Sequence, residues 1–216
     1  KTRQRETASN RAPEEFEEAS VVWDHIGQTG IDALTGADML KTAPPAYKST
    51  VEYGGDALSQ SLKGISQVHL SGIGTRIFYA QLGGFDVHGN QIQMQNQLLD
   101  NMSRSVRDFF DDLKEHNASE EVIMMIFSEF GRRVKDNGNG TDHGSGGGTF
   151  IIGDRVNGGF YEEYPSLAPE DQLEGDMHFK HDFRSIYSTV LEQWLGVNPS
   201  PIVNGTFDQF EGVFNK

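Results

Sequence analysis

The chain has 216 residues, of which 36% are hydrophobic, and this is enough for one α/β domain with a substantial core or for most of a larger one. Its formal net charge of −14, from 32 acidic and 18 basic residues, argues against nucleic acid as a partner, because phosphate backbones attract basic surfaces. The absence of cysteine excludes disulfides, thiolate metal sites and thiol nucleophiles, so that any metal ion must take His, Asp or Glu ligands.

The N-terminal part of the chain is polar. Residues 1–20 are highly charged, and residues 21–40 have modest apolar content that predicts at most a helical segment without a strong core face. We therefore separate a polar, partly helical segment, residues 1–50, from an α/β domain over residues 51–216. No apolar run approaches the ~20 residues that a bilayer requires, and no signal-peptide pattern is present, so no membrane span is predicted.

The central part of the chain predicts a strand, a helix and a second strand. Apolar residues at helical spacing indicate a first helix from Asp56, which ends before a strand over residues 75–82. A long amphipathic helix is predicted over residues 91–116, followed by a strand over residues 122–127. Such a unit is expected to have a right-handed crossover between parallel strands. The predicted fold class is α/β with a mostly parallel sheet.

The C-terminal part is predicted to be less regular. Residues 138–148 are rich in glycine and indicate a loop, and residues 149–153 indicate a short strand. A final helix is predicted from Asp182 to Leu195, with His181 or Asp182 as its cap. We expect the histidines outside the two clusters described next to have structural or surface roles.

Two clusters of possible metal ligands follow predicted strands. Asp86 and His88 come after the pair Gly83-Gly84, and Asp142 and His143 stand together in the glycine-rich loop. Polar groups beyond the carboxyl ends of parallel strands tend to meet at one edge of the sheet, where ligands bind. The alternatives are a helix-capping Asp with a surface His in the first cluster, and an Asx turn with an exposed His in the second. Together the clusters favour a site.

Charged residues also follow the strand at 122–127. Glu129 is placed to bind a metal ion or act as a base, and Arg132 and Arg133 are suited to bind a phosphate or sulfate group. A salt bridge between Glu129 and either arginine is the alternative. The chain contains neither the Gly-x-Ser-x-Gly motif of serine hydrolases nor a phosphate-binding loop of the Gly-x-x-x-x-Gly-Lys-Ser/Thr type.

Several longer motifs occur in one order along the chain: residues 83–91, 127–133, 137–138, 140–144, 158–159, 182–184 and 194–196. Their order and spacing resemble the C-terminal half of the domain-of-unknown-function 1501 family, with the likeness running from about Tyr53 to Leu195. That family is grouped with the alkaline phosphatase and sulfatase superfamily, and its members are commonly exported bacterial proteins. The resemblance implies a three-layer, alkaline-phosphatase-like sandwich, of which this chain holds part, and a periplasmic or secreted location.

The same resemblance implies a set of site residues. Asp86, His88 and His143 would form one metal site, with Asp142 as a further candidate metal ligand. Glu129 would replace an aspartate of a second site, and Arg132 or Arg133 would bind the oxyanion. Phe130 stands where the second site would have a histidine, and phenylalanine does not bind metals. The implied cofactor is one or two divalent ions, such as zinc or manganese.

Two functions follow from this resemblance. The first is a metal-dependent hydrolase of phosphate or sulfate esters that acts on a small-molecule or carbohydrate ester, with a Ser or Thr nucleophile that comes from an N-terminal half outside this chain. The second is a catalytically silent exported binding or surface protein that retains the fold.

Overall fold

The computed structural model describes residues 47–215, which divide into two units. One unit contains residues 67–78 together with Tyr47 and Lys48, and the other contains residues 49–66 and 79–215. The polar segment predicted for residues 1–50 lies almost wholly outside the described residues. The described part contains both helices and strands, which agrees with the predicted α/β class as far as this mixture is concerned.

The smaller unit holds the last turn of helix α2 (Ala57–Leu70) and the chain that follows it. The predicted strand at residues 75–82 begins in this unit and continues in the larger one. These residues are assigned to no strand, and none of the described residues pairs with them as a strand. The strand prediction is therefore wrong in the described structure, because an apolar run becomes a strand only where a partner edge accepts its hydrogen bonds.

The larger unit has a helical core in which α2 contacts helix α3 (Gln91–Glu115). Leu58 and Leu62 of α2 and Phe109 and Leu113 of α3 are buried, as their helical spacing predicts. The hydroxyl groups of Ser59 and Ser105 lie 2.8 Å apart and link the two helices inside this core. The long predicted helix thus forms within one residue of its expected end.

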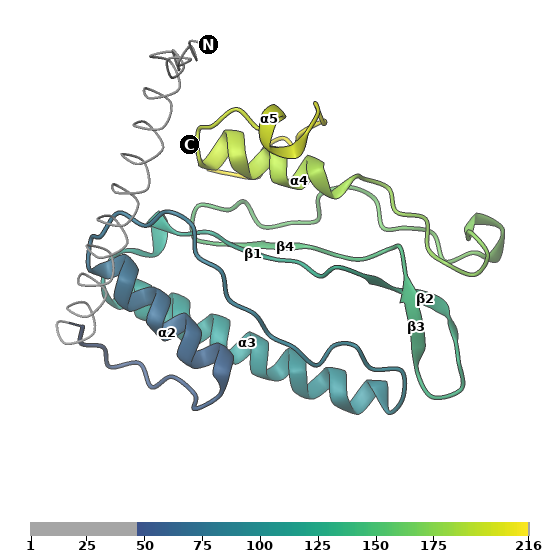
Figure 1. Ribbon diagram of the computed structural model, residues 1–216, viewed down its shortest axis with the longest axis horizontal. Helices are drawn as coiled ribbons and strands as arrows, with labels where there is room; N and C mark the ends of the chain where they lie inside the picture. Colours follow the sequence, from purple (N-terminus) through teal and green to yellow (C-terminus); the bar gives the residue numbers. More distant parts are fainter. Residues whose placement is uncertain (1–46, 216) are drawn as a thin grey trace, which may run out of the picture. The chain divides into compact units, whose positions relative to one another are not determined.

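Two short antiparallel ladders follow α3 in the larger unit (Figure 1). Strand β1 (Met124–Ile126) pairs with β4 (Phe150–Ile152), so that Met124 faces Ile152. Strand β2 (Gly131–Asp136) pairs with β3 (Thr141–Gly144) as a hairpin with an irregular register between Arg132 and Asp136. The described residues therefore support neither the predicted parallel sheet nor the three-layer sandwich, and the predicted loop at 138–148 contains a strand.

The C-terminal helix is interrupted. Helix α4 (Phe183–Thr189) is followed by a π-helical turn, η3 (Val190–Trp194), and Gly196 then takes a positive φ of 69°. Asp182 caps α4, because its carboxylate accepts a hydrogen bond from the backbone N–H of Arg184 at 2.9 Å. This confirms the predicted cap.

The remaining elements are short. They are the 3₁₀ turns η1 (Ser119–Glu121) and η2 (Pro169–Asp171) and the helix α5 (Ser200–Val203). Across residues 47–215, no helix is long and apolar enough to cross a membrane, as the sequence predicts.

Candidate metal centre

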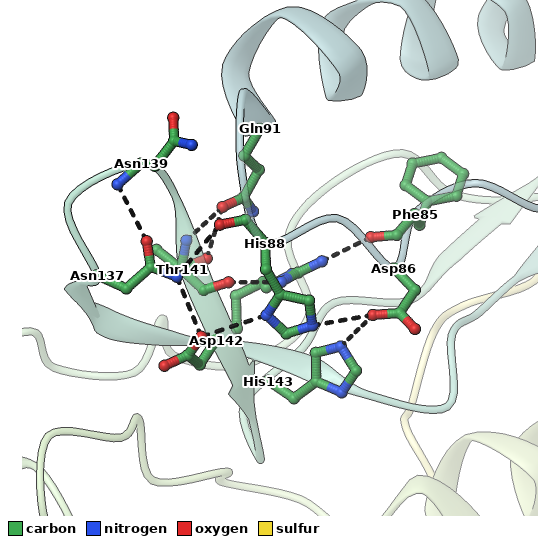
Figure 2. Close-up of polar contacts among 10 residues, drawn as sticks. Phe85, Asp86, His88, Gln91, Asn137, Asn139, Thr141, Asp142 and His143 are labelled. Atoms are coloured by element: carbon green, nitrogen blue, oxygen red, sulfur yellow. Dashed lines mark hydrogen bonds and ion pairs between the residues drawn. The ribbon is translucent and has the colours of Figure 1, made fainter.

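Three side chains meet in the larger unit, around one carboxylate oxygen. Oδ1 of Asp86 lies 2.8 Å from Nε2 of His143 and 3.1 Å from Nε2 of His88 (Figure 2). One ligand atom from each residue can be chosen so that all three lie within 4.8 Å of one another. The structure thus brings the two predicted clusters together: Asp86 and His88 of the first cluster meet His143 of the second.

Different elements supply the three side chains. Asp86 and His88 lie in the loop that precedes α3, and His143 lies on β3 opposite Arg132 of β2. The loop turns at Gly84, whose φ of 100° is a conformation that side chains disfavour. The site is therefore built where this loop passes the β2–β3 hairpin.

Polar ties hold the loop and the hairpin together. Oε1 of the buried Gln91, at the start of α3, accepts hydrogen bonds from the backbone N–H and the hydroxyl of Thr141, at 2.5 and 3.0 Å. The guanidinium of Arg132 donates to the backbone oxygens of Thr141 and Phe85, each at 2.6 Å. These ties fix Asp86 and His143 relative to each other, since Phe85 directly precedes Asp86 and Thr141 lies two residues before His143 on β3.

The other predicted site residues lie outside the three-residue group. Asp142 contacts the opposite ring nitrogen of His88, Nδ1, at 3.2 Å. Glu129 is exposed and lies near the Ser128 hydroxyl, at 3.4 Å. Arg132 is committed to backbone oxygens, and Arg133 donates to the backbone oxygen of Glu174 at 2.8 Å. The arginines therefore serve the scaffold in this structure.

The carboxylates of the site are stabilised in their charged form. The hydrogen bond from His143, supported by His88, lowers the pKa of Asp86 below its usual value. Hydrogen bonds from Asn137 and then from His88 lower the pKa of Asp142 in the same way. Both side chains are thus anionic across the physiological pH range.

The donor set fits a divalent transition metal. One carboxylate oxygen and two imidazole nitrogens are the usual ligands of zinc, and a catalytic zinc has three protein ligands with one open position. Metal–ligand bonds of 2.0–2.2 Å in a tetrahedron place ligand atoms about 3.4 Å apart. The Asp86 oxygen lies 2.8 and 3.1 Å from the two histidine nitrogens, a little closer than this separation. The Asp86 side chain is 68% exposed, which leaves an approach for a further ligand.

Two supporting residues were not predicted from the sequence as part of the site. Gln91 appeared only within a family motif and at the start of a predicted helix, and Asn137, which binds Asp142, appeared only within a family motif. A signal for the hairpin was present, because Asn137-Gly138 and Asn139-Gly140 are the dipeptides that favour tight turns between strands.

Comparisons with known proteins identify a family. The family model described as "Protein of unknown function (DUF1501)" matches residues 4–209. The match extends beyond the region from about Tyr53 to Leu195 in which the sequence motifs were found. A comparison with curated proteins gave no match, and neither did one with solved structures.

Proposed function

We propose that this chain, which belongs to the DUF1501 family, is a metal-dependent hydrolase of phosphate or sulfate esters in which Asp86, His88 and His143 hold one divalent ion. The observation that carries the proposal is the meeting of one Asp86 oxygen with two imidazole nitrogens, one of them 57 residues away in the sequence. Zinc and manganese both accept such donors. A bound ion supplies Lewis-acid chemistry toward an ester oxygen.

The charge of the donor set suits an anionic ester. Asp86 contributes one negative charge and neutral imidazoles contribute none, so a divalent ion held by these three residues keeps a net positive charge. The chain as a whole carries a net charge of −14, which repels phosphate and sulfate esters. A local positive centre at Asp86 offsets this repulsion where the ester binds.

The number of ions in this proposal is one. Within residues 47–215, the structure gathers one group of His, Asp and Glu side chains that could hold an ion. Phe130, which stands in the position of the expected second-site histidine, instead stacks on the ring of His143. Glu129 lies outside the group.

The broader predictions belong to the same proposal. They are membership of the alkaline phosphatase and sulfatase superfamily with its three-layer sandwich and mostly parallel sheet, a periplasmic or secreted location, and a small-molecule or carbohydrate ester as substrate. What supports them is that the chain belongs to the DUF1501 family, whose resemblance to that superfamily implies them.

A second function is a catalytically silent exported binding or surface protein. It is favoured by the hydrogen bonds of Arg132, whose guanidinium donates to the backbone oxygens of Phe85 and Thr141. This guanidinium therefore stabilises the fold in place of binding an oxyanion. In that case Asp86, His88 and His143 stabilise the loop and the hairpin through their hydrogen bonds.

Metal analysis combined with turnover assays tests these functions. We expect one zinc or manganese ion per purified chain and hydrolysis of an aryl phosphate or an aryl sulfate, both lost in His143→Ala. The matched control is His181→Ala, because His181 also contacts a carboxylate, Glu162 at 3.2 Å, and its side chain is 38% exposed against 40% for His143. This control is expected to retain metal and turnover.

The outcomes separate the two functions. A parent protein that takes up no stoichiometric metal, even after incubation with zinc or manganese, contradicts the hydrolase. Metal binding without turnover of either ester supports the silent binding protein. Turnover that His143→Ala abolishes and His181→Ala preserves counts against the silent protein.

A further inference from the structure

We infer that Asp142 is a positioning residue for His88, and that it does not bind the metal ion itself. Its Oδ1 lies 3.2 Å from Nδ1 of His88, whereas the Asp86 oxygen lies 3.1 Å from Nε2 of the same ring (Figure 2). The ring therefore separates Asp142 from the candidate metal position. The inference rests on the proposed function for the presence of the ion.

The two ring nitrogens have different tasks. An imidazole binds a metal ion through a nitrogen without a proton, and the other nitrogen carries the proton and donates it to an acceptor. Nε2 of His88 lies on the side of Asp86 and His143, and the two imidazole rings stack with centroids 4.7 Å apart. When Nε2 of His88 binds the ion, the ring proton is on Nδ1, and the Asp142 carboxylate, 3.2 Å away, is placed to accept it.

Asn137 holds Asp142 in this position. Its amide nitrogen donates to Oδ1 of Asp142 at 3.1 Å and to the backbone oxygen of His88 at 3.3 Å. The amide oxygen of Asn137 accepts from the backbone N–H of Asn139 at 3.0 Å, which fixes the orientation of the amide. Asn137 in the hairpin turn therefore holds both the Asp142 carboxylate and the backbone of His88, the residue that Asp142 orients.

Metal affinity in Asp142 variants tests the inference. Zinc affinity is measured by competition with a chromophoric chelator for the parent chain, Asp142→Ala and Asp142→Asn. We expect Asp142→Ala to bind zinc about 10–100-fold more weakly, the usual effect of losing a carboxylate behind a histidine ligand. Asp142→Asn retains an oxygen acceptor for the Nδ1 proton, so its loss is expected to be smaller.

Asp136→Asn is the matched control. It removes one negative charge from the same hairpin, and the asparagine retains an acceptor for the backbone N–H of Gly138, which Asp136 binds at 2.6 Å. Its zinc affinity is expected to equal that of the parent. Equal weakening in Asp136→Asn and Asp142→Asn would mean that overall charge causes the effect, and it would overturn the inference.

Cobalt spectra distinguish positioning from ligation. At saturating Co²⁺, Asp142→Ala is expected to show the visible spectrum of the parent, because all three ligands remain. A changed coordination spectrum would make Asp142 a ligand and overturn the inference. Parent-like zinc affinity in Asp142→Ala would also overturn it, while the proposed function would stand.

If the parent protein binds no metal, the proposed function is wrong. The positioning role of Asp142 can then be tested in the metal-free protein. Crystal structures of the metal-free parent and of Asp142→Ala then report the orientation of the His88 ring. We expect the ring to turn away from Asp86 and His143 in the variant. An unchanged stack on His143 would overturn the positioning role.

Discussion

The ring of His143 lies flat against the ring of Phe130, with centroids 3.8 Å apart and planes 9° from parallel. Phe130 is also near the guanidinium carbon of Arg132, which lies 5.2 Å from its ring centroid. This stack restrains one face of a candidate metal ligand, in a site whose side chains are otherwise well exposed. A residue that cannot bind a metal ion thus limits the motion of one that can.

Phe130→Leu is expected to weaken zinc binding about 2–10-fold, because an aromatic pair contributes roughly 0.5–1.5 kcal/mol beyond its buried area. Competition with a chelator measures the change. Phe127→Leu is the control, since Phe127 is 48% exposed and contacts Tyr187 rather than the site. Equal affinities for Phe130→Leu and the parent would show that the stack does not restrain His143.

Gly131→Ala is expected to destabilise the hairpin that carries His143. A Cβ atom at Gly131 would lie 1.8 Å from the backbone oxygen of Gly146, and a backbone atom cannot move aside as the end of a side chain can. We expect a loss of at least about 2 kcal/mol in the free energy of unfolding, measured by chemical denaturation.

Gly148→Ala provides the comparison for Gly131→Ala. A Cβ atom at Gly148 meets nothing within 4 Å, so this substitution is expected to change stability by no more than about 0.5 kcal/mol. Similar stabilities for the two variants would contradict the close approach of Gly131 and Gly146.

The elements that were predicted well are those whose signal is local. The helix α3 has an apolar face that continues over its whole length, and Asp182 has the residue type and position of an N-cap. The strands β1 and β4 also lie within the apolar runs predicted for them. For the helix and its cap, neighbouring residues along the chain determine the structure, whereas the two strands also need each other as partners.

Strand pairing and the shape of the site depend on distant residues. The apolar run at 122–127 does not specify its partner, and β1 pairs antiparallel with β4 rather than parallel with 75–82. Asp86, His88 and His143 were predicted to meet at the edge of a parallel sheet. They do meet, but the β2–β3 hairpin and the ties of Arg132 and Gln91 bring them together.

Gln91→Ala is expected to weaken both the fold and the site. The Gln91 side chain accepts from the backbone N–H and the hydroxyl of Thr141, so its removal leaves two donors without this acceptor. The expected loss is about 1–3 kcal/mol in the free energy of unfolding, together with weaker zinc binding.

Gln95→Ala is the control for Gln91→Ala. Gln95 lies one turn further along α3, and its side chain contacts Gln91 at 3.4 Å rather than the hairpin. If the two alanine variants have the same stability and the same zinc affinity, Gln91 does not tie α3 to β3.

The pH dependence of stability provides a test at α4, away from the metal centre. Hydrogen bonds from the side chain and the backbone N–H of Arg184 lower the pKa of Asp182 to about 2. Because this folded-state pKa is below the unfolded value of about 3.9, the stabilisation is fully present above pH ~4 and is lost as the pH falls through about 2.

Asp182→Asn isolates this contribution, since asparagine also caps helices but cannot form the ion pair with Arg184, whose nitrogen lies 2.6 Å from Asp182. We expect the variant to melt at a lower temperature than the parent at neutral pH, and the difference to shrink steadily as the pH falls below about 4. Thermal melts of both proteins from neutral to acidic pH measure it. A difference that stays constant over this range would mean that the charge of Asp182 does not stabilise α4.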